Sequence, residues 1–144
     1  MKKVLFIFGI FTSAIFFAQK SENYYQISYN SICCGPPSEK PVRDYIQKFQ
    51  GKNKSKTVEI YKQTGLGREG EFKLFVGLDA LSKSNKRKFI SGLEAAINAQ
   101  NTAKGGSDGT VDFMGSSMVS KKNLSALPNT TLSNKTVITK QKIK

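Results

Sequence analysis

The sequence of 144 residues contains no histidine, only two cysteines and only three arginines among its 23 basic residues. Without histidine the chain lacks the side chain that activates serine and cysteine nucleophiles and that most often ligates metals. The two cysteines, Cys33 and Cys34, cannot form a four-ligand zinc site alone. Its ten acidic residues show no calcium-loop spacing. We therefore predict no catalytic residues, no metal site and no cofactor, and we do not expect an enzyme.

Acidic residues are scarce relative to basic ones, which leaves a formal net charge of +13. Such an excess favours contact with anionic surfaces such as acidic polymers and phosphorylated lipids. Because the basic residues are mostly lysine, the chain is poor in the planar guanidinium groups that read guanine or clamp phosphate in a bidentate way. We therefore predict no specific nucleic-acid recognition. A merely soluble, lysine-rich exterior is the alternative interpretation.

A long hydrophobic run is also absent, although residues 1–18 contain a short one. Two lysines precede an apolar run from Val4 to Phe17, and Ala18 ends it before a polar stretch. About 14 apolar residues are too few for a permanent span of a ~30 Å bilayer, and this pattern is typical of a secretory signal peptide. The Ala18-Gln19 junction is similar to those of exported proteins of Gram-negative bacteria. We predict a periplasmic or extracellular protein with no transmembrane segment after cleavage; cleavage after Ala14 and an uncleaved anchor are the alternatives.

Two alternating stretches flank a glycine-rich link in the middle of the chain. Thr57 to Gln63 is rich in β-branched and aromatic residues, and Glu71 to Leu78 has apolar residues at every second position. A period of two predicts strands, so the two stretches form a hairpin. An amphipathic helix capped by Ser82 or Ser84 follows. Its apolar positions recur every four residues: Phe89, Leu93 and Ile97.

Another strand and helix precede the hairpin. Tyr24 to Ile32 alternates and predicts a strand, which the prolines after Cys34 end. A helix from about Ser38 to Gly51 follows, with apolar residues at helical spacing: Val42, Tyr45, Ile46 and Phe49. Thr110 to Met114 predicts a final short strand. The order predicts an α+β two-layer sandwich of the ferredoxin-like βαββαβ type, with an antiparallel-containing sheet and both helices on one face. Without the final strand, a three-stranded α+β layer is the alternative.

Composition divides the chain into three parts. Residues 1–18 form the predicted signal peptide, and residues 19–114 form a single α+β domain. From Gly115 to Lys144 the chain is mostly serine, threonine, asparagine and lysine with isolated apolar residues. So little apolar surface does not offset the entropy of ordering the segment. We therefore predict a flexible, basic C-terminal tail.

The link Gly65 to Gly70 matches the dinucleotide-binding spacing G-x-G-x-x-G. In that motif the last glycine opens a helix whose N-terminus meets the pyrophosphate. Here an alternating stretch follows, so we interpret the link as a hairpin loop whose glycines supply positive φ. Arg68 and Glu69 are the polar residues of the loop that a ligand would contact.

Cys33 and Cys34 are adjacent, so no long-range disulfide within one chain is available. Neighbouring Cα atoms lie ~3.8 Å apart, whereas disulfides usually span ~4.4–6.8 Å, so a bond between them would be strained and easily reduced. Three interpretations remain open. The pair forms a strained vicinal bridge, it stays as two thiols of which at least one packs as a small apolar group, or it bridges two chains.

Two functional hypotheses follow from the sequence. The first is a non-enzymatic exported domain that contacts a protein partner or an anionic envelope component through its surface. Its candidate contacts are the C-terminal tail and basic residues of the hairpin loop and of the second helix: Arg68, Lys83, Lys86, Arg87 and Lys88. Cations at a helix start oppose the macrodipole, which suggests that this cluster serves something other than the helix. The second hypothesis is a thiol-redox protein that uses Cys33 and Cys34. The sequence does not specify the oligomeric state.

Overall fold

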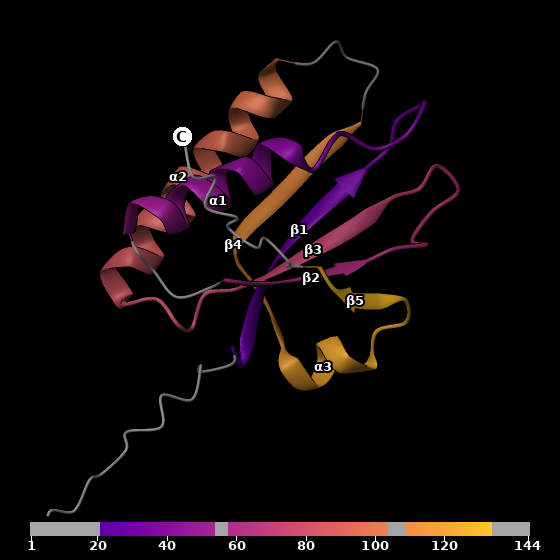
Figure 1. Ribbon diagram of the computed structural model, residues 1–144. Helices are drawn as coiled ribbons and strands as arrows, with labels where there is room; N and C mark the ends of the chain where they lie inside the picture. Colours follow the sequence, from indigo (N-terminus) through magenta and orange to yellow (C-terminus); the bar gives the residue numbers. More distant parts are fainter. Residues whose placement is uncertain (1–20, 54–57, 104–108, 134–144) are drawn as a thin grey trace, which may run out of the picture.

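The structure, a computed structural model, describes residues 21–53, 58–103 and 109–133. Its elements are β1 (Asn23–Asn30), α1 (Lys40–Asn53), β2 (Glu59–Gln63), β3 (Phe72–Gly77), α2 (Lys83–Thr102), β4 (Thr110–Ser120), α3 (Lys121–Ala126) and β5 (Thr130–Leu132). The strands form one antiparallel sheet in the order β4-β1-β3-β2-β5 (Figure 1). The connections through α1 and α2 each skip one strand, which is the ferredoxin-like arrangement. The predicted α+β fold is confirmed.

The main core lies between the sheet and helices α1 and α2, which both cover one face (Figure 1). The alternation predicted for β3 is confirmed, because Phe72, Leu74 and Val76 point into this core. Each helix contributes the apolar stripe that its spacing predicts: Val42, Ile46 and Phe49 from α1, and Phe89, Leu93 and Ile97 from α2. Phe49 and Phe89 meet edge to face with ring centroids 5.0 Å apart, which fixes where the helices cross.

The start of α2 agrees with one of the two predicted caps, whereas the end of α1 differs from expectation. Ser82 is the N-cap of α2, and its Oγ accepts a hydrogen bond of 3.3 Å from the backbone N–H of Asn85. Helix α1 continues past Gly51 to Asn53. The side-chain amide of Asn53 donates to the carbonyl of Phe49 at 2.8 Å, so this last-turn carbonyl keeps a partner.

A second, smaller core lies on the opposite face of the sheet. Phe75 sits between Leu74 and Val76 in sequence and therefore points away from the helix pair. It packs with Tyr24 and with Leu124 of α3. The ordered domain consequently extends to Ser133, beyond the boundary at residue 114 that composition suggested. Leu124 buries its side chain against two aromatic rings from distant strands. A count of apolar residues within the segment does not reveal this contact.

Strand β4 is longer than the predicted Thr110 to Met114, because β1 pairs with it over nearly its whole length. The register passes from Ile27 opposite Phe113 to Tyr25 opposite Met118, so β4 bulges between these pairs. The bulge lets a glycine- and serine-rich stretch continue the strand without regular alternation.

Some expectations fall outside the described residues. These are the signal peptide at residues 1–18 and the part of the tail from residue 134 onward. Among the helices in the described ranges, none has the length and apolar character needed to cross a bilayer.

Candidate functional site

Helices α1 and α2 run antiparallel, which brings the end of α1 beside the start of α2 (Figure 1). The Tyr45 hydroxyl donates to the carbonyl of Phe89 at 2.8 Å, while at the other end the Gln100 amide donates to the carbonyl of Ser38 at 2.8 Å. Exposed cations of both helices therefore gather at one end of the helix layer, which we call the basic end: Lys48, Lys52, Lys83, Arg87 and Lys88. None of these five forms an ion pair with another residue in the described ranges.

Lys86 belongs to the same helix turn but is engaged elsewhere. Its ammonium group lies 2.7 Å from the carboxylate of Asp79, which also accepts hydrogen bonds from the backbone N–H groups of Glu22 and Asn23. Burial alone would raise the pKa of Asp79, but the hydrogen bonds from Lys86 and from these two N–H groups outweigh it and hold the pKa below its usual value. Lys86 therefore fastens the start of β1 to α2.

Arg68 lies at the opposite end of the sheet from the basic end. It belongs to the loop between β2 and β3, whereas α2 starts beyond the far end of β3 (Figure 1). The loop is the predicted glycine hairpin: Gly65 and Gly70 have φ of 72° and 85°, and β3 follows where a nucleotide-binding motif would need a helix. The structure thus brings together Lys83, Arg87 and Lys88, but not Arg68.

Cys33 and Cys34 lie in the loop between β1 and α1, at the same end of the sheet as Arg68. Both are exposed and not disulfide-bonded, with their sulfur atoms 2.8 Å apart. Cys34 has φ of 71° and Gly35 has φ of 99°, so the chain turns sharply at the thiols. A left-handed residue with a side chain costs about 1–2 kcal/mol, which places local strain at the second thiol. A Cβ on Gly35 would lie 3.8 Å from the carbonyl oxygen of Glu69, so the thiol loop and the hairpin loop are neighbours.

Buried polar groups surround the base of this thiol loop. Three of them have no hydrogen-bond partner in the described part of the chain: Tyr29 Oη, Ser31 Oγ and Gln100 Oε1. Burial raises the pKa of the Tyr29 phenol, the nearby Glu39 carboxylate raises it further, and Arg43 opposes them. Polar groups buried without partners are costly, so the loop is packed less favourably than the helix layer.

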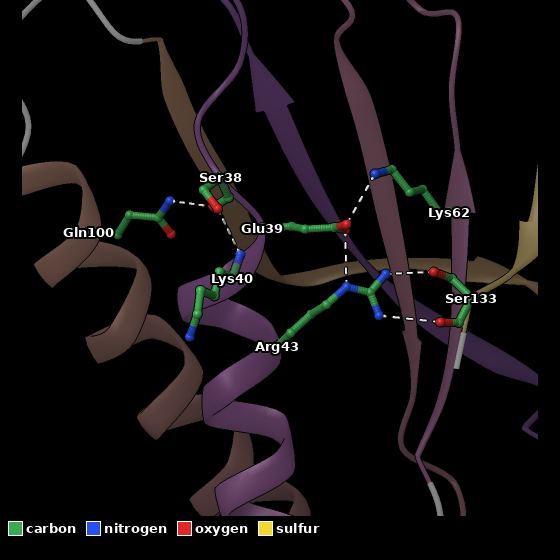
Figure 2. Close-up of polar contacts among 7 residues, drawn as sticks. All are labelled: Ser38, Glu39, Lys40, Arg43, Lys62, Gln100 and Ser133. Atoms are coloured by element: carbon green, nitrogen blue, oxygen red, sulfur yellow. Dashed lines mark hydrogen bonds and ion pairs between the residues drawn. The ribbon is translucent and has the colours of Figure 1, made fainter. Parts of the chain in front are cut away.

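A charged network holds the loop where it enters α1. The Glu39 carboxylate lies 3.1 Å from Arg43 Nε and 3.2 Å from Lys62 Nζ, and Arg43 in turn donates to Ser133 (Figure 2). Lys62 also stands over the ring of Phe72, 4.1 Å from its centroid. The network links α1, β2 and the residue after β5, and its single carboxylate, Glu39, pairs with both cations. The network therefore connects these three parts of the fold and is not a second cluster of exposed, unpaired cations.

Two features escaped the sequence. Lys48 and Lys52 join the basic end only because the helices pack antiparallel, and no local signal in α1 marks them. An open groove between α2 and β4 depends on the sheet order and has no motif either. Within the described ranges, no group of three or more potential metal ligands is present.

Comparisons with protein-family models, with curated proteins and with solved structures give no match to this chain.

Proposed function

We propose that this protein is an exported, non-enzymatic domain that binds anionic envelope surfaces through its basic end. One observation carries the proposal: five exposed cations from two antiparallel helices lie at the same end of the helix layer, without ion pairs to other described residues. Mutual repulsion disfavours this cluster in the isolated protein, and the α2 macrodipole disfavours its members at the start of α2. An anionic partner offsets both effects by electrostatic attraction.

The composition of the basic end favours a diffuse partner over a discrete ligand. Four of its five cations are lysines, which act as point charges on flexible stems and have no fixed bidentate geometry. Such groups suit anionic lipid headgroups, acidic polysaccharides or the acidic surface of a protein partner. Binding should therefore weaken steeply as salt concentration rises.

Vesicle binding tests the proposal with a chain that starts at Gln19, since every core residue lies after it. The probe is a vesicle of phosphatidylcholine with or without phosphatidylglycerol. The variant Lys48→Gln/Lys83→Gln/Lys88→Gln should bind the anionic vesicle roughly a hundredfold more weakly, because each lysine near such a surface contributes about 1 kcal/mol.

The matched control removes the same charge elsewhere, as Lys40→Gln/Arg68→Gln/Lys122→Gln. It should retain most of the binding. Equal losses in the two triple variants would show that only net charge matters, and the assignment to the basic end would then be wrong. Heparin chromatography of the same proteins extends the comparison to an acidic polysaccharide.

A second candidate function is thiol redox exchange, favoured by two exposed sulfur atoms in contact at 2.8 Å. In this reaction one cysteine thiolate attacks an external disulfide and releases one thiol, and the neighbouring cysteine then displaces the other. The external disulfide is reduced to two thiols, Cys33 and Cys34 are oxidised to a vicinal disulfide, and their two protons leave with the released thiols.

Equilibration with glutathione redox buffers, followed by alkylation and mass spectrometry, tests this function. The strain of a vicinal bridge predicts a reduction potential above that of structural disulfides, with a two-electron transition. The Cys34→Ser variant should show only a mixed disulfide with glutathione. Two thiols that stay unoxidised at every buffer ratio would exclude the redox function and leave the surface-binding proposal untouched.

A further inference from the structure

An open groove of about 610 Å³ runs between α2 and β4. Its walls come from two elements: Glu94, Ile97, Asn98 and Asn101 of α2, and Val111, Asp112, Phe113 and Met114 of β4. Four consecutive strand residues line it, whereas a hollow over one face of a sheet would be lined by alternate residues. The groove therefore follows the outer edge of β4. This edge pairs with no other strand in the described ranges.

One side chain already pairs with this edge as a strand would. The amide of Asn101 donates to the carbonyl of Val111 at 2.8 Å, and its oxygen accepts from the N–H of Val111 at 3.0 Å. The N–H and C=O of Val111 therefore point outward, away from β1. Because strand residues alternate, those of Phe113 point the same way. Among the described residues, no strand lies beside the outward groups of Phe113, so they can pair with a further strand.

The part of the strand from Val111 to Phe113, which precedes the bulge, lacks the lysine and proline that often block such an edge. Proteins protect edge strands with lysine, proline or a covering element, yet none of the 11 residues of β4 is lysine, arginine or proline. Met114 is 67% exposed beside the groove. Buried Ile97 and Val111 give the groove an apolar floor. An extended chain placed here would pair with the edge and insert alternate side chains against α2.

The charge of the groove selects the chemistry of its occupant. Its lining carries two carboxylates, Glu94 and Asp112, and no cationic side chain. This is the reverse of the basic end, which lies at the other end of α2, and of the chain as a whole. A second copy joined through β4 would bring another Asp112 to this strand edge. A basic segment matches the groove better.

We propose that this groove binds an extended peptide that adds as a sixth strand to the edge of β4 and directs a lysine or arginine toward Glu94. Main-chain hydrogen bonds to the Phe113 region supply affinity, and the apolar floor with its carboxylate rim selects alternating apolar and basic side chains. The proposal does not depend on the function of the basic end.

The probe is an eight-residue peptide of alternating valine and lysine, titrated into the chain from Gln19 onward and followed by NMR. We expect amide shifts confined to β4 and the C-terminal half of α2, with slower hydrogen exchange at Phe113. A peptide of the same sequence with every amide N-methylated keeps the side chains but cannot donate to the edge, so it should bind at least about tenfold more weakly.

Two substitutions on one helix separate the groove from general charge effects. Glu94→Lys reverses the groove charge and should weaken peptide binding about fivefold or more. Ala95→Lys adds a lysine at the next exposed position, outside the groove, and should change binding much less. Equal binding of the methylated peptide, shifts that map to the basic end, or self-association through β4 that the peptide cannot reverse would each overturn the proposal.

Discussion

Arg43 and Ser133 lie 90 positions apart in sequence, yet the Arg43 guanidinium donates hydrogen bonds to both the backbone carbonyl and the side-chain hydroxyl of Ser133. One guanidinium nitrogen donates to the carbonyl at 3.3 Å and the other donates to the hydroxyl at 2.6 Å (Figure 2). The same side chain pairs with Glu39 through Nε. The planar fork satisfies three contacts from one position, which a lysine cannot do. Arg43 therefore connects α1 to the end of the described domain.

Replacing Arg43 should destabilise the folded protein, because its contacts with Ser133 and Glu39 are lost or weakened. We expect Arg43→Lys to lower the free energy of unfolding by about 1–2 kcal/mol, because two hydrogen bonds are lost and Glu39 keeps only part of its pairing. Urea denaturation measures the change. Arg87→Lys is the matched control, since Arg87 is exposed and forms no ion pair within the described residues. Equal stability of the two variants would show that the Ser133 contact contributes nothing.

Helix α3 should be part of the cooperative domain rather than a loose addition. Leu124 is 2% exposed and packs against Tyr24 and Phe75, whereas Leu132 is 58% exposed. Leu124→Ala should cost about 2–3 kcal/mol through lost burial and the cavity it leaves. Leu132→Ala should change stability by less than about 0.5 kcal/mol. A negligible effect of Leu124→Ala on thermal unfolding would mean that α3 does not unfold with the sheet.

Loss of the hydroxyl group from each of the two buried tyrosines of β1 should change the stability of the protein differently. Tyr24 Oη donates to Glu59 at 2.7 Å and lies 3.0 Å from the carbonyl of Ser21, whereas Tyr29 Oη has no partner in the described part of the chain. Tyr24→Phe should destabilise by about 1–2 kcal/mol, because it also leaves Glu59 without this donor. Tyr29→Phe should be neutral or stabilising, since it keeps the ring stacked 4.3 Å from Phe72 and removes an unpaired hydroxyl. Destabilisation by both substitutions would contradict this difference.

The acid stability of the protein should depend on Asp79. Because its folded pKa lies below the ordinary value of 3.8, its ionised form stabilises the folded state above that pH, and the contribution is lost as pH falls through the folded pKa. The stability gap between the wild type and Asp79→Asn should be largest near neutral pH and should shrink below about pH 4. Chemical denaturation at several pH values measures the gap. Lys86→Met should reduce it, because Lys86 is the charged partner. A gap that stays constant down to pH 2 would show that the Asp79 contacts do not couple to folding.

The sequence determined the fold because its signals are local and repeated. Alternation in β3 and four-residue spacing in α2 reflect which side of an element faces apolar surroundings, and each holds over several residues. Alternation after Gly70 likewise predicted a strand, so the glycine-rich link was correctly interpreted as a hairpin loop. It failed for α3, because one buried leucine has no period and gains its apolar surroundings only from Tyr24 and Phe75 on distant strands.

The candidate sites depended on what packing places together. Local sequence identified the cations at the start of α2, but antiparallel helix packing added Lys48 and Lys52. The ion pair with Asp79 engages Lys86, and the position of the β2–β3 loop leaves Arg68 at the far end of the sheet. The groove along β4 exists because sheet order leaves that strand at an edge beside α2. Periodicity records the environment of one element, whereas a surface between elements is set by long-range contacts, and only the tertiary structure fixes those.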